Sequence, residues 1–346
     1  MMRDYYRCLL EALEEGWGGM AATVVAAEDA GCLGERLYLD AAGNVRWRPA
    51  SAALAERLEA FLRQGSAGEG DLVEVPGVGT VYVERVRSGP RVLVLGAGHV
   101  AQALAQVLAL LRYQTTVVDD RPEFANQALF PTAARIICGD FMEVLAHYPF
   151  DESTFVVIVT RGHRHDQACL RAVVQKPLGY VGMIGSRRKV NAVLTALAEE
   201  GIAQEKLAAV HAPIGLDIGA QTPEEIAISI AAELIAVNNR CRGERLDPVW
   251  LEQAVSAPRA VVATVVRSRG SAPRRAGARM LVRPDGQIAG SVGGGAGEAA
   301  VRLAAREVLA SGRPRLMVLD LAQDAAAAEG MICGGRMDVF LEPLQD

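Results

Sequence analysis

The spacing of apolar residues changes along the chain, and in its middle part the spacing predicts strands that alternate with helices. Residues 91–95 (RVLVL) are an unbroken apolar run, which predicts a buried strand. In residues 99–111 (HVAQALAQVLALL) apolar side chains recur three and four positions apart, which predicts a helix. Four more strands are predicted at TTVVDD (115–120), ARIICGD (134–140), STFVVIVT (153–160) and GYVGMIGS (179–186). Such alternation over about 150 residues is typical of a doubly wound parallel sheet, the Rossmann-like class of α/β fold.

Two further helices are predicted after the last of these strands. One covers residues 187–201 (RRKVNAVLTALAEEG), and the other covers residues 222–240 (TPEEIAISIAAELIAVNNR). The second has Thr222 as a suitable N-cap, Pro223 at its first helical position and acidic residues in its first turn. We expect this helix to close the central domain.

The two ends of the chain share one order of predicted elements. Residues 21–45 (AATVVAAEDAGCLGERLYLDAAGNV) and 262–288 (VATVVRSRGSAPRRAGARMLVRPDGQI) each contain a Thr-Val-Val strand, a loop, a second strand and a turn, at Gly43 or Gly286. In both, an Ala/Leu/Arg-rich helix and two more strands follow. We interpret the ends as two small α/β units related by a degenerate internal repeat. The expected domains are residues 1–88, the Rossmann-like domain at 89–243, and residues 244–346.

Composition and charge exclude several classes of protein. Of the 346 residues, 51% are hydrophobic and 22% charged, which suits two or three globular domains. The net charge of −5 and the absence of a Lys/Arg block argue against a nucleic-acid partner. Six scattered cysteines without a C-x-x-C pair predict reduced thiols and a cytoplasmic location. We expect no signal peptide and no membrane span, because no apolar stretch approaches the roughly 20 residues required.

A glycine turn directly after the first central strand predicts a phosphate-binding site. It reads Gly96-x-Gly98-x-x-Ala101, where Gly96 permits the sharp turn and Gly98 lets a phosphate approach the backbone. Asp119 ends the next strand, where an acid can accept a hydrogen bond from a ribose hydroxyl. Asp120 follows and is interpreted as a turn residue. The pattern predicts a nucleotide or a nucleotide-bearing cofactor.

A polar loop follows the fourth central strand, at the edge where open α/β sheets bind ligands. It contains Gly162 and His163, with His165 and Asp166 close behind. These side chains could contact a ligand or bind a metal, or the segment could be only a polar loop. His99, in the glycine turn, has two interpretations as well: a solvent-facing side chain or a cofactor contact.

Two basic or glycine-rich segments add candidate anion sites. Ser186 and Arg187 follow the fifth central strand and could hold an anionic group, or simply begin a surface helix. The C-terminal unit carries three loops that its N-terminal counterpart lacks or reduces. A glycine run before a helix is typical of an anion nest, arginines can bind phosphate through paired hydrogen bonds, and a cysteine among glycines is sterically open. The alternative is that these loops are only turns and that the thiol of Cys333 has no functional role. The candidate residues of these loops are Arg274, Arg275, Gly293, Gly294, Gly295, Glu298, Cys333, Gly334 and Gly335.

Several long segments resemble the XdhC/CoxI family. In the central domain they are LGAGHVAQAL, VVDDRPEFAN, TRGHRHDQACL, GYVGMIGSRRK and LDIGAQTPEEIAISIAAEL, and near the C-terminus VVRSRGSAPRRAGARMLV, GQIAGSVGGG and CGGRMDVFLEPL. Members of this family are accessory factors for molybdenum hydroxylases such as xanthine dehydrogenase. The resemblance implies a protein that binds the molybdenum cofactor, favours its sulfuration together with a cysteine desulfurase, and inserts it into the apo-enzyme. It implies a maturation factor rather than an enzyme, with residues 1–88 as a degenerate XdhC/CoxI-like unit.

The sequence departs from the family pattern in two respects. The glycine- and cysteine-loop domain usually precedes the Rossmann domain, whereas here it follows it. The family's glycine loop commonly reads S-G-G-C-V-E, and its cysteine corresponds here to Ala296 and its acid to Glu298. Cys333 is then the matching cysteine that is left, and the resemblance implies that it is a metal ligand. An elongated phosphate-bearing cofactor would be expected in a cleft between the Rossmann edge and the C-terminal unit.

Alternative functions remain at this point. The glycine turn and Asp119 also suit an NAD(P)-dependent oxidoreductase, with His163 and His165 as the nearest general acid/base candidates. Because Ala296 replaces a cysteine, a scaffold that has lost its cofactor is a third hypothesis. The Rossmann domain could hold NAD(P) or part of a molybdenum cofactor in its mono- or dinucleotide form, and the apolar-rich composition permits a homodimer.

Overall fold

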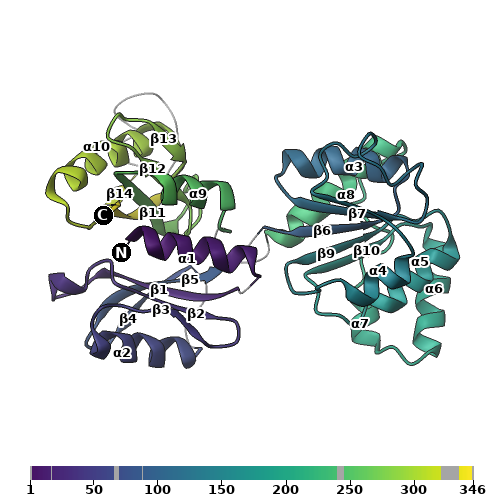
Figure 1. Cartoon of the computed structure of the whole chain (residues 1–346), viewed down its shortest axis with the longest axis horizontal. Coiled ribbons are helices and arrows are strands. Elements are labelled where there is room, and N and C mark those ends of the chain that lie inside the picture. The colour runs from purple at the N-terminus through teal and green to yellow at the C-terminus, as the bar shows by residue number, and fades with distance from the viewer. Residues whose placement is uncertain are drawn as a thin grey trace. The chain divides into compact units, whose positions relative to one another are not determined.

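The structure is a computed structural model, and it describes residues 2–16, 18–65, 70–87, 89–239, 245–320 and 335–344. The chain forms two compact units (Figure 1). One unit combines Met1–Ser88 with Arg242–Asp346, and the other is Gly89–Cys241. The two ends of the sequence therefore fold together, and the central segment is inserted between them in the chain.

The central unit is a Rossmann-like domain, as the periodicity predicts. Its five strands are parallel and lie in the order β10-β9-β6-β7-β8. In chain order the sheet first grows from β6 toward β8 and then from β9 to β10 on the other side, so the strand order reverses between β6 and β9. In such sheets the reversal marks the ligand crevice. The strands are β6 (Arg91–Leu95), β7 (Gln114–Asp119), β8 (Arg135–Cys138), β9 (Thr154–Ile158) and β10 (Tyr180–Met183).

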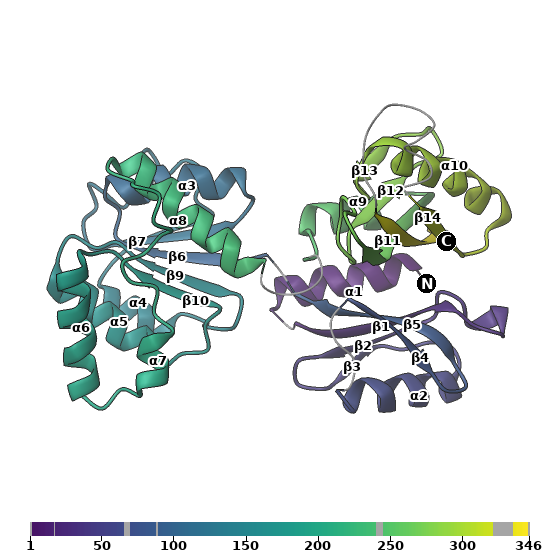
Figure 2. The ribbon, with the colours of Figure 1, turned by 180° about the vertical axis from the view of Figure 1, so that it is seen from behind.

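Helices cover both faces of this sheet (Figure 2). Val92 and Val94 of β6 pack toward α3 and α8, whereas Leu93 and Leu95 pack toward α4, α5, α6 and α7. A strand buried on both faces has no polar side, which explains the unbroken apolar run in the sequence. The helices are α3 (His99–Leu110), α4 (Phe141–His147), α5 (His163–Val173), α6 (Arg187–Glu199), α7 (Gln204–Ala208) and α8 (Pro223–Asn238).

The predicted start of α8 is confirmed in detail. The side chain of Thr222 accepts a hydrogen bond from the backbone N–H of Glu225, and the Glu225 carboxylate accepts one from the backbone N–H of Thr222. This capping box satisfies two backbone donors that the first helical turn leaves open. It fixes where α8 begins, and the apolar residues of α8 pack it against the sheet.

The other unit contains the two predicted copies, and their topology is the same. The first has sheet order β3-β2-β1-β5-β4 and the second β13-β12-β11-β15-β14, with antiparallel neighbours throughout. Both contain a register shift at the same place, between Val24 and Ala26 in β1 and between Val265 and Arg267 in β11. The internal repeat is thus confirmed in three dimensions.

Each copy has a helix before its sheet and a helix within it. The first copy comprises α1 (Met2–Glu14), β1 (Gly19–Ala26), the short 3₁₀ helix η1 (Ala30–Cys32), β2 (Arg36–Asp40), β3 (Val45–Trp47), α2 (Ala52–Arg63), β4 (Asp71–Val75) and β5 (Gly79–Val86). The second comprises α9 (Pro248–Ser256), β11 (Ala260–Arg269), β12 (Arg279–Val282), β13 (Ile288–Gly290), α10 (Gly295–Ser311), β14 (Arg315–Asp320) and β15 (Arg336–Leu344). Helix α2 packs on the first sheet and α10 on the second, whereas α1 and α9 share one core cluster (Figure 1).

Two equivalent ion pairs, each between a buried arginine of one copy and a glutamate of the other, join the copies. Arg36 of the first copy forms an ion pair with Glu342 of the second, and Arg279 of the second donates to Glu84 of the first at 2.6 Å. The pairing registers make Arg36 equivalent to Arg279, because each lies opposite the corresponding threonine of the neighbouring strand. The two glutamates are equivalent in the same way. The copies therefore meet as the two halves of a symmetric dimer would.

These ion pairs are enclosed by aromatic side chains. The exposed fraction is 5% for the side chain of Arg36 and 0% for that of Glu342. Tyr6 of α1 donates its hydroxyl to Glu342 at 2.9 Å, and the guanidinium of Arg36 lies 4.7 Å from the centre of the Tyr5 ring. A buried charge needs such partners, because removing one member leaves the other uncompensated.

Replacing Glu84 with Leu is therefore expected to destabilise the two-copy unit strongly. The guanidinium of Arg279 would remain buried without its carboxylate, at a cost of about 3–5 kcal/mol in the free energy of unfolding. The double variant Glu84→Leu/Arg279→Met should recover most of that loss, because both charges are gone. All three tryptophans belong to this unit, so urea unfolding followed by tryptophan fluorescence measures it selectively.

The exposed pair between Arg63 and Glu59, with N and O 2.8 Å apart, provides the matched control. Glu59→Ala should change the free energy of unfolding by less than about 1 kcal/mol, because solvent screens that pair. Equal losses in Glu84→Leu and the double variant would contradict the account given for Arg279.

Candidate functional site

The glycine turn of the Rossmann domain is fixed by close backbone packing. Gly96 has φ +108°, and a Cβ atom on it would lie 2.4 Å from the carbonyl oxygen of Val159, just beyond β9. Only glycine fits this position, as the sequence pattern predicts. The turn is thereby pressed against the end of β9, at the point where the strand order reverses.

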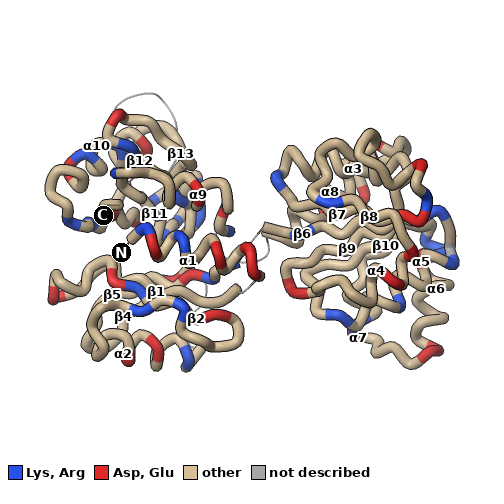
Figure 3. Tube along the Cα trace, viewed as in Figure 1, with Lys and Arg blue, Asp and Glu red and all other residues tan. Residues whose placement is uncertain are grey.

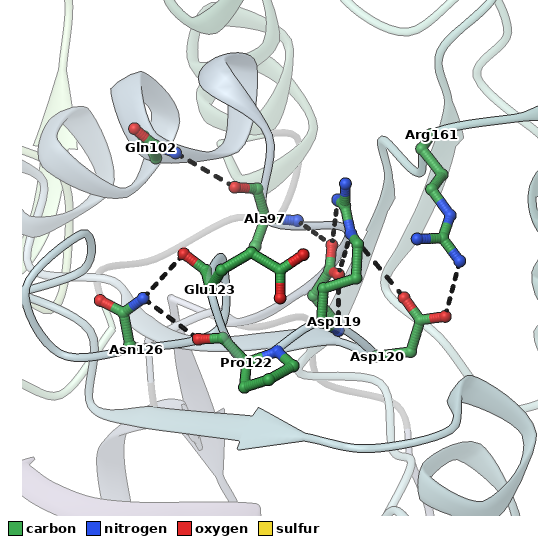
Figure 4. Close-up of polar contacts among 9 residues, drawn as sticks. Ala97, Gln102, Asp119, Asp120, Pro122, Glu123, Asn126 and Arg161 are labelled. Atoms are coloured by element: carbon green, nitrogen blue, oxygen red, sulfur yellow. Dashed lines mark hydrogen bonds and ion pairs between the residues drawn. The ribbon is translucent and has the colours of Figure 1, made fainter.

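Asp119 holds the same turn from the other side. Its carboxylate accepts a hydrogen bond from the backbone N–H of Ala97 at 2.8 Å and is also bound by Arg121 through the backbone N–H and two guanidinium nitrogens (Figure 4). Burial opposes ionisation, but these hydrogen bonds hold the pKa of Asp119 below its ordinary value. Its exposed fraction is 2%, and both oxygens are engaged. The ribose contact predicted for Asp119 remains a prediction, and in this structure Asp119 orders the glycine turn.

Asp120 and Arg161 form a second layer of charge at this edge. Arg161 donates to Asp120 at 2.8 Å, and the Nε of Arg121 lies 3.9 Å from the same carboxylate (Figure 4). The guanidinium of Arg121 also stacks on the ring of Phe124, 3.9 Å from its centre. Asp120, interpreted from the sequence as a turn residue only, thus links the ends of β7 and β9. The sequence reasoning missed Arg121 and Arg161; each lies within three residues of a strand end on the ligand-binding edge.

Two helices begin at this edge with glycine as the N-cap. These are Gly98 for α3 and Gly162 for α5, and within the described chain no side chain caps either helix. A Cβ on Gly98 or Gly162 would meet nothing within 4 Å, so the backbone there is open to an approaching group. His99 is exposed, as in the first interpretation of it. The side chain of His163 lies outside the part of the chain that the structure describes.

Ser186 and Arg187 stand at the start of α6. Ser186 is the N-cap, and its hydroxyl accepts from the backbone N–H of Lys189 at 3.4 Å. Arg187 is 86% exposed and lies 3.9 Å from Asp217. Basic residues gather where α6 begins (Figure 3). This geometry fits a surface helix start and leaves anion binding by Arg187 as a prediction.

A buried carboxylate cluster fixes the loop before α8. Glu233 accepts hydrogen bonds from Tyr180, His211 and the backbone N–H of Gly215, at 2.5, 3.0 and 2.9 Å. Burial opposes its ionisation, but these bonds lower the pKa of Glu233. The sequence analysis did not identify this cluster, because its members come from three separate segments. It holds the loop rigidly against the sheet.

The candidate loops of the C-terminal copy converge. A Cβ on Gly293 would lie 2.3 Å from the side chain of Pro273, and one on Gly335 would lie 2.5 Å from the backbone nitrogen of Ala272. The loop after β11 is therefore in contact with both the glycine run and the start of β15. Arg274 lies beside Gly293, and Arg275 is exposed next to it. Three segments that are far apart in the sequence thus form one site.

The glycine run that leads into α10 has a backbone conformation that favours glycine. Gly293, Gly294 and Gly295 all have positive φ, and among described residues no side chain caps α10. The run leads into the N-terminus of α10, where open backbone N–H groups and the helix dipole favour an anion. Ser291 orders the turn by donating to Glu298 at 2.8 Å and accepting from the N–H of Gly293 at 3.0 Å. Glu298, predicted to bind cofactor, has this structural contact here.

Cys333 and Gly334 lie outside the described residues. Within the described ranges, no cluster of three or more His, Cys, Asp or Glu side chains is arranged to hold a metal ion. In those same ranges, no helix is long and apolar enough to cross a membrane.

The parallel sheet and its glycine turn define the central unit as a Rossmann-fold domain. The model of the XdhC Rossmann domain matches residues 92–234, and the XdhC and CoxI family model matches residues 255–320. Together they match well over half of the chain. The chain therefore belongs to the XdhC and CoxI family, as its resemblance indicates.

Curated relatives agree with this assignment. The chain is 37% identical over 168 residues to "Uncharacterized protein YqeB" of Escherichia coli, covering 48% of this chain and 31% of that protein. It is 29% identical over 160 residues to a probable subunit of xanthine dehydrogenase from Bacillus subtilis, covering 46% of each. It is 46% identical over 65 residues to "Molybdenum cofactor insertion chaperone PaoD" of E. coli, covering 19% of this chain and 20% of that protein. The chain spans less than half the length of these relatives.

A solved structure shares the fold. A protein described as a xanthine dehydrogenase from Bacillus halodurans superposes with a TM-score of 0.52 at 23% identity. The match covers 66% of this chain and 62% of that one. At this identity the likeness concerns the fold alone.

The two glycines of the Rossmann turn are expected to differ sharply when each is replaced by alanine. Gly96→Ala should destabilise the Rossmann unit by about 3 kcal/mol or more, because its Cβ meets backbone and its φ is positive. Gly98→Ala should cost less than about 0.5 kcal/mol, because its Cβ meets nothing. Urea unfolding followed by circular dichroism measures both, and similar losses in the two variants would contradict this assignment.

The stabilisation from Asp119 is expected to depend on pH. Because its folded pKa lies below the ordinary value of 3.8, its contribution is fully present above about pH 4 and is lost as the pH falls through the folded pKa. At pH 7, Asp119→Asn should cost about 1–3 kcal/mol in unfolding free energy. The difference between wild type and variant should shrink as the pH falls below about 4. A difference independent of pH would show that the charge on Asp119 is not what holds the turn.

Proposed function

We propose that this protein binds the molybdenum cofactor and assists its sulfuration and its insertion into a molybdenum hydroxylase of the xanthine dehydrogenase type. Membership of the XdhC and CoxI family supports a role in maturation, and one relative is named as a molybdenum cofactor insertion chaperone. The partners in this proposal are the apo-enzyme and a cysteine desulfurase. The observation that carries it is the convergence of three loops in the C-terminal copy.

The C-terminal site suits the phosphate end of a pterin cofactor. The glycine run Gly293, Gly294 and Gly295 leads into the open N-terminus of α10, and Arg274 lies beside Gly293, with the exposed Arg275 next in the chain. Helix N-termini and guanidinium groups both bind phosphate oxygens through charge-assisted hydrogen bonds. In this proposal the start of α10 would bind the cofactor's phosphate, and Cys333 would supply a thiolate ligand to its metal.

The Rossmann unit adds a second anion site. Gly98 opens the backbone at the start of α3, where N–H groups and the helix dipole favour a pyrophosphate. A cofactor in its dinucleotide form carries such a group. We propose that this turn binds a nucleotide-bearing form of the cofactor in its own right, separately from the site in the C-terminal copy, and NAD(P) is the competing ligand that the first experiment must distinguish.

The cofactor content of the purified protein tests the proposal. The full chain would be expressed in cells that make the molybdenum cofactor and purified without oxygen, and molybdenum and oxidised pterin would be measured per chain. Near-stoichiometric pterin is the expected result. Release of a nicotinamide nucleotide without pterin would overturn the proposal and favour an oxidoreductase.

The cysteine role has its own pair of variants. Cys333→Ser is expected to lower retained molybdenum and the activation of an added apo-hydroxylase, because the thiolate is lost. Cys138→Ser is the matched control, since Cys138 is an exposed free cysteine at the end of β8 in the other unit. Unchanged molybdenum content and activation in Cys333→Ser would show that this thiol has no part in the function.

A further inference from the structure

We propose that Arg161 is a ligand for the pyrophosphate of a nucleoside diphosphate group, and that Asp120 holds its place until that group binds. The inference rests on the proposed function of the Rossmann turn and goes beyond it, because it assigns two residues and an exchange of partners. It begins from an ion pair that crosses the end of the central strand.

The strand order fixes where this ion pair lies. Strand β6 is hydrogen-bonded to β9 on one side and to β7 on the other. Asp120 directly follows β7, and Arg161 comes three residues after β9. Their contact at 2.8 Å therefore spans from one neighbour of β6 to the other (Figure 4). Between them, β6 ends in the glycine turn.

A dinucleotide on a Rossmann sheet follows the same path. It crosses the carboxyl ends of the strands on both sides of the reversal point, with its pyrophosphate over the first glycine turn. A ligand in this position must come close to the Asp120–Arg161 contact. Phosphate oxygens repel the Asp120 carboxylate and attract the Arg161 guanidinium, so the ligand and Asp120 compete for the same donors.

The charges between this ion pair and the glycine turn are already paired with one another. Both oxygens of Asp119 are bound by Ala97 and Arg121, and Arg121 is held by that carboxylate and by the ring of Phe124. Arg161 is different, because its side chain is 46% exposed and its contact with Asp120 is a single hydrogen bond. A guanidinium has five N–H donors, which leaves a fork for two phosphate oxygens. Of the two arginines in contact with Asp120, Arg161 is therefore the better able to change partners.

The competition predicts opposite effects for the two members of one ion pair. Asp120→Asn should tighten binding of ADP and CDP about three- to ten-fold, because the competing charge is removed. Arg161→Gln should weaken binding by a similar factor of roughly three to ten. The double variant should bind as weakly as Arg161→Gln, because Asp120 acts through Arg161. Isothermal titration calorimetry of the full chain with each nucleotide measures all four proteins.

Two further variants control for general charge effects. Arg164→Gln removes a nearby exposed arginine on α5, and Glu143→Gln removes an exposed carboxylate on α4 of the same unit. Neither should change affinity by more than about two-fold, since solvent screens isolated surface charges. Circular dichroism confirms that each variant is folded.

The outcomes are distinct. Binding to Asp120→Asn alone, with none to wild type, supports the exchange. Four results would overturn it. Two concern the single variants: weaker binding in both Asp120→Asn and Arg161→Gln, or a loss in Arg164→Gln equal to that in Arg161→Gln. The other two are tighter binding that persists in the double variant, and no binding to either wild type or Asp120→Asn. Pterin retained by the wild type in that last case would leave the cofactor proposal standing. Opposite nucleotide effects without any retained pterin would instead overturn the cofactor proposal alone.

Discussion

Two arginines buried between equivalent strands are the constraint on which the larger unit depends. Arg36 and Arg279 lie where each copy faces the other, and each forms an ion pair with a glutamate of the opposite copy. Neither sheet can present that face to water without also exposing the core shared by α1 and α9. Because a lone buried charge is costly, the contact selects this one arrangement of the copies over slipped alternatives. The sheet that carries the loops of the C-terminal copy is therefore stabilised by contacts with the N-terminal copy.

The Rossmann turn shows how one carboxylate can serve the backbone instead of a ligand. Asp119 stands where an acid commonly receives a ribose, yet its oxygens hold Ala97 and Arg121. The turn is thus ordered before any ligand binds, so binding does not carry the entropic cost of ordering it. The exposed charges one step further out, at Asp120 and Arg161, remain able to respond. Neighbouring residues thus have different roles: Asp119 orders the glycine turn, and Asp120 with Arg161 can respond to a ligand.

The sequence predicts the fold well where burial leaves a periodic trace. Strands such as RVLVL are apolar on both faces, and the capping box at Thr222 is local, so both are visible in the chain. The pairing of the copies is not, because Arg36 and Glu342 are 306 positions apart and each resembles an ordinary surface charge. The use of Asp119 to hold the glycine turn depends on Ala97, 22 positions away, which comes within reach only when the two strands pair. Convergence of the loops around Gly293 likewise depends on the sheet that brings Pro273 to it.

The interrupted layout of the two-copy unit has a consequence for biosynthesis. When the first copy leaves the ribosome, Tyr6, Arg36 and Glu84 have not yet met their partners in the second copy. Glu342 is synthesised only after the whole Rossmann segment. At roughly 5–20 residues per second, that interval lasts on the order of ten seconds or more. During it, the face of one nascent chain is complementary to the same face on a neighbouring chain, because each copy carries both an arginine and a glutamate. Chains translated close together are thus exposed to intermolecular exchange of copies, and the centrally inserted domain sets how long that exposure lasts.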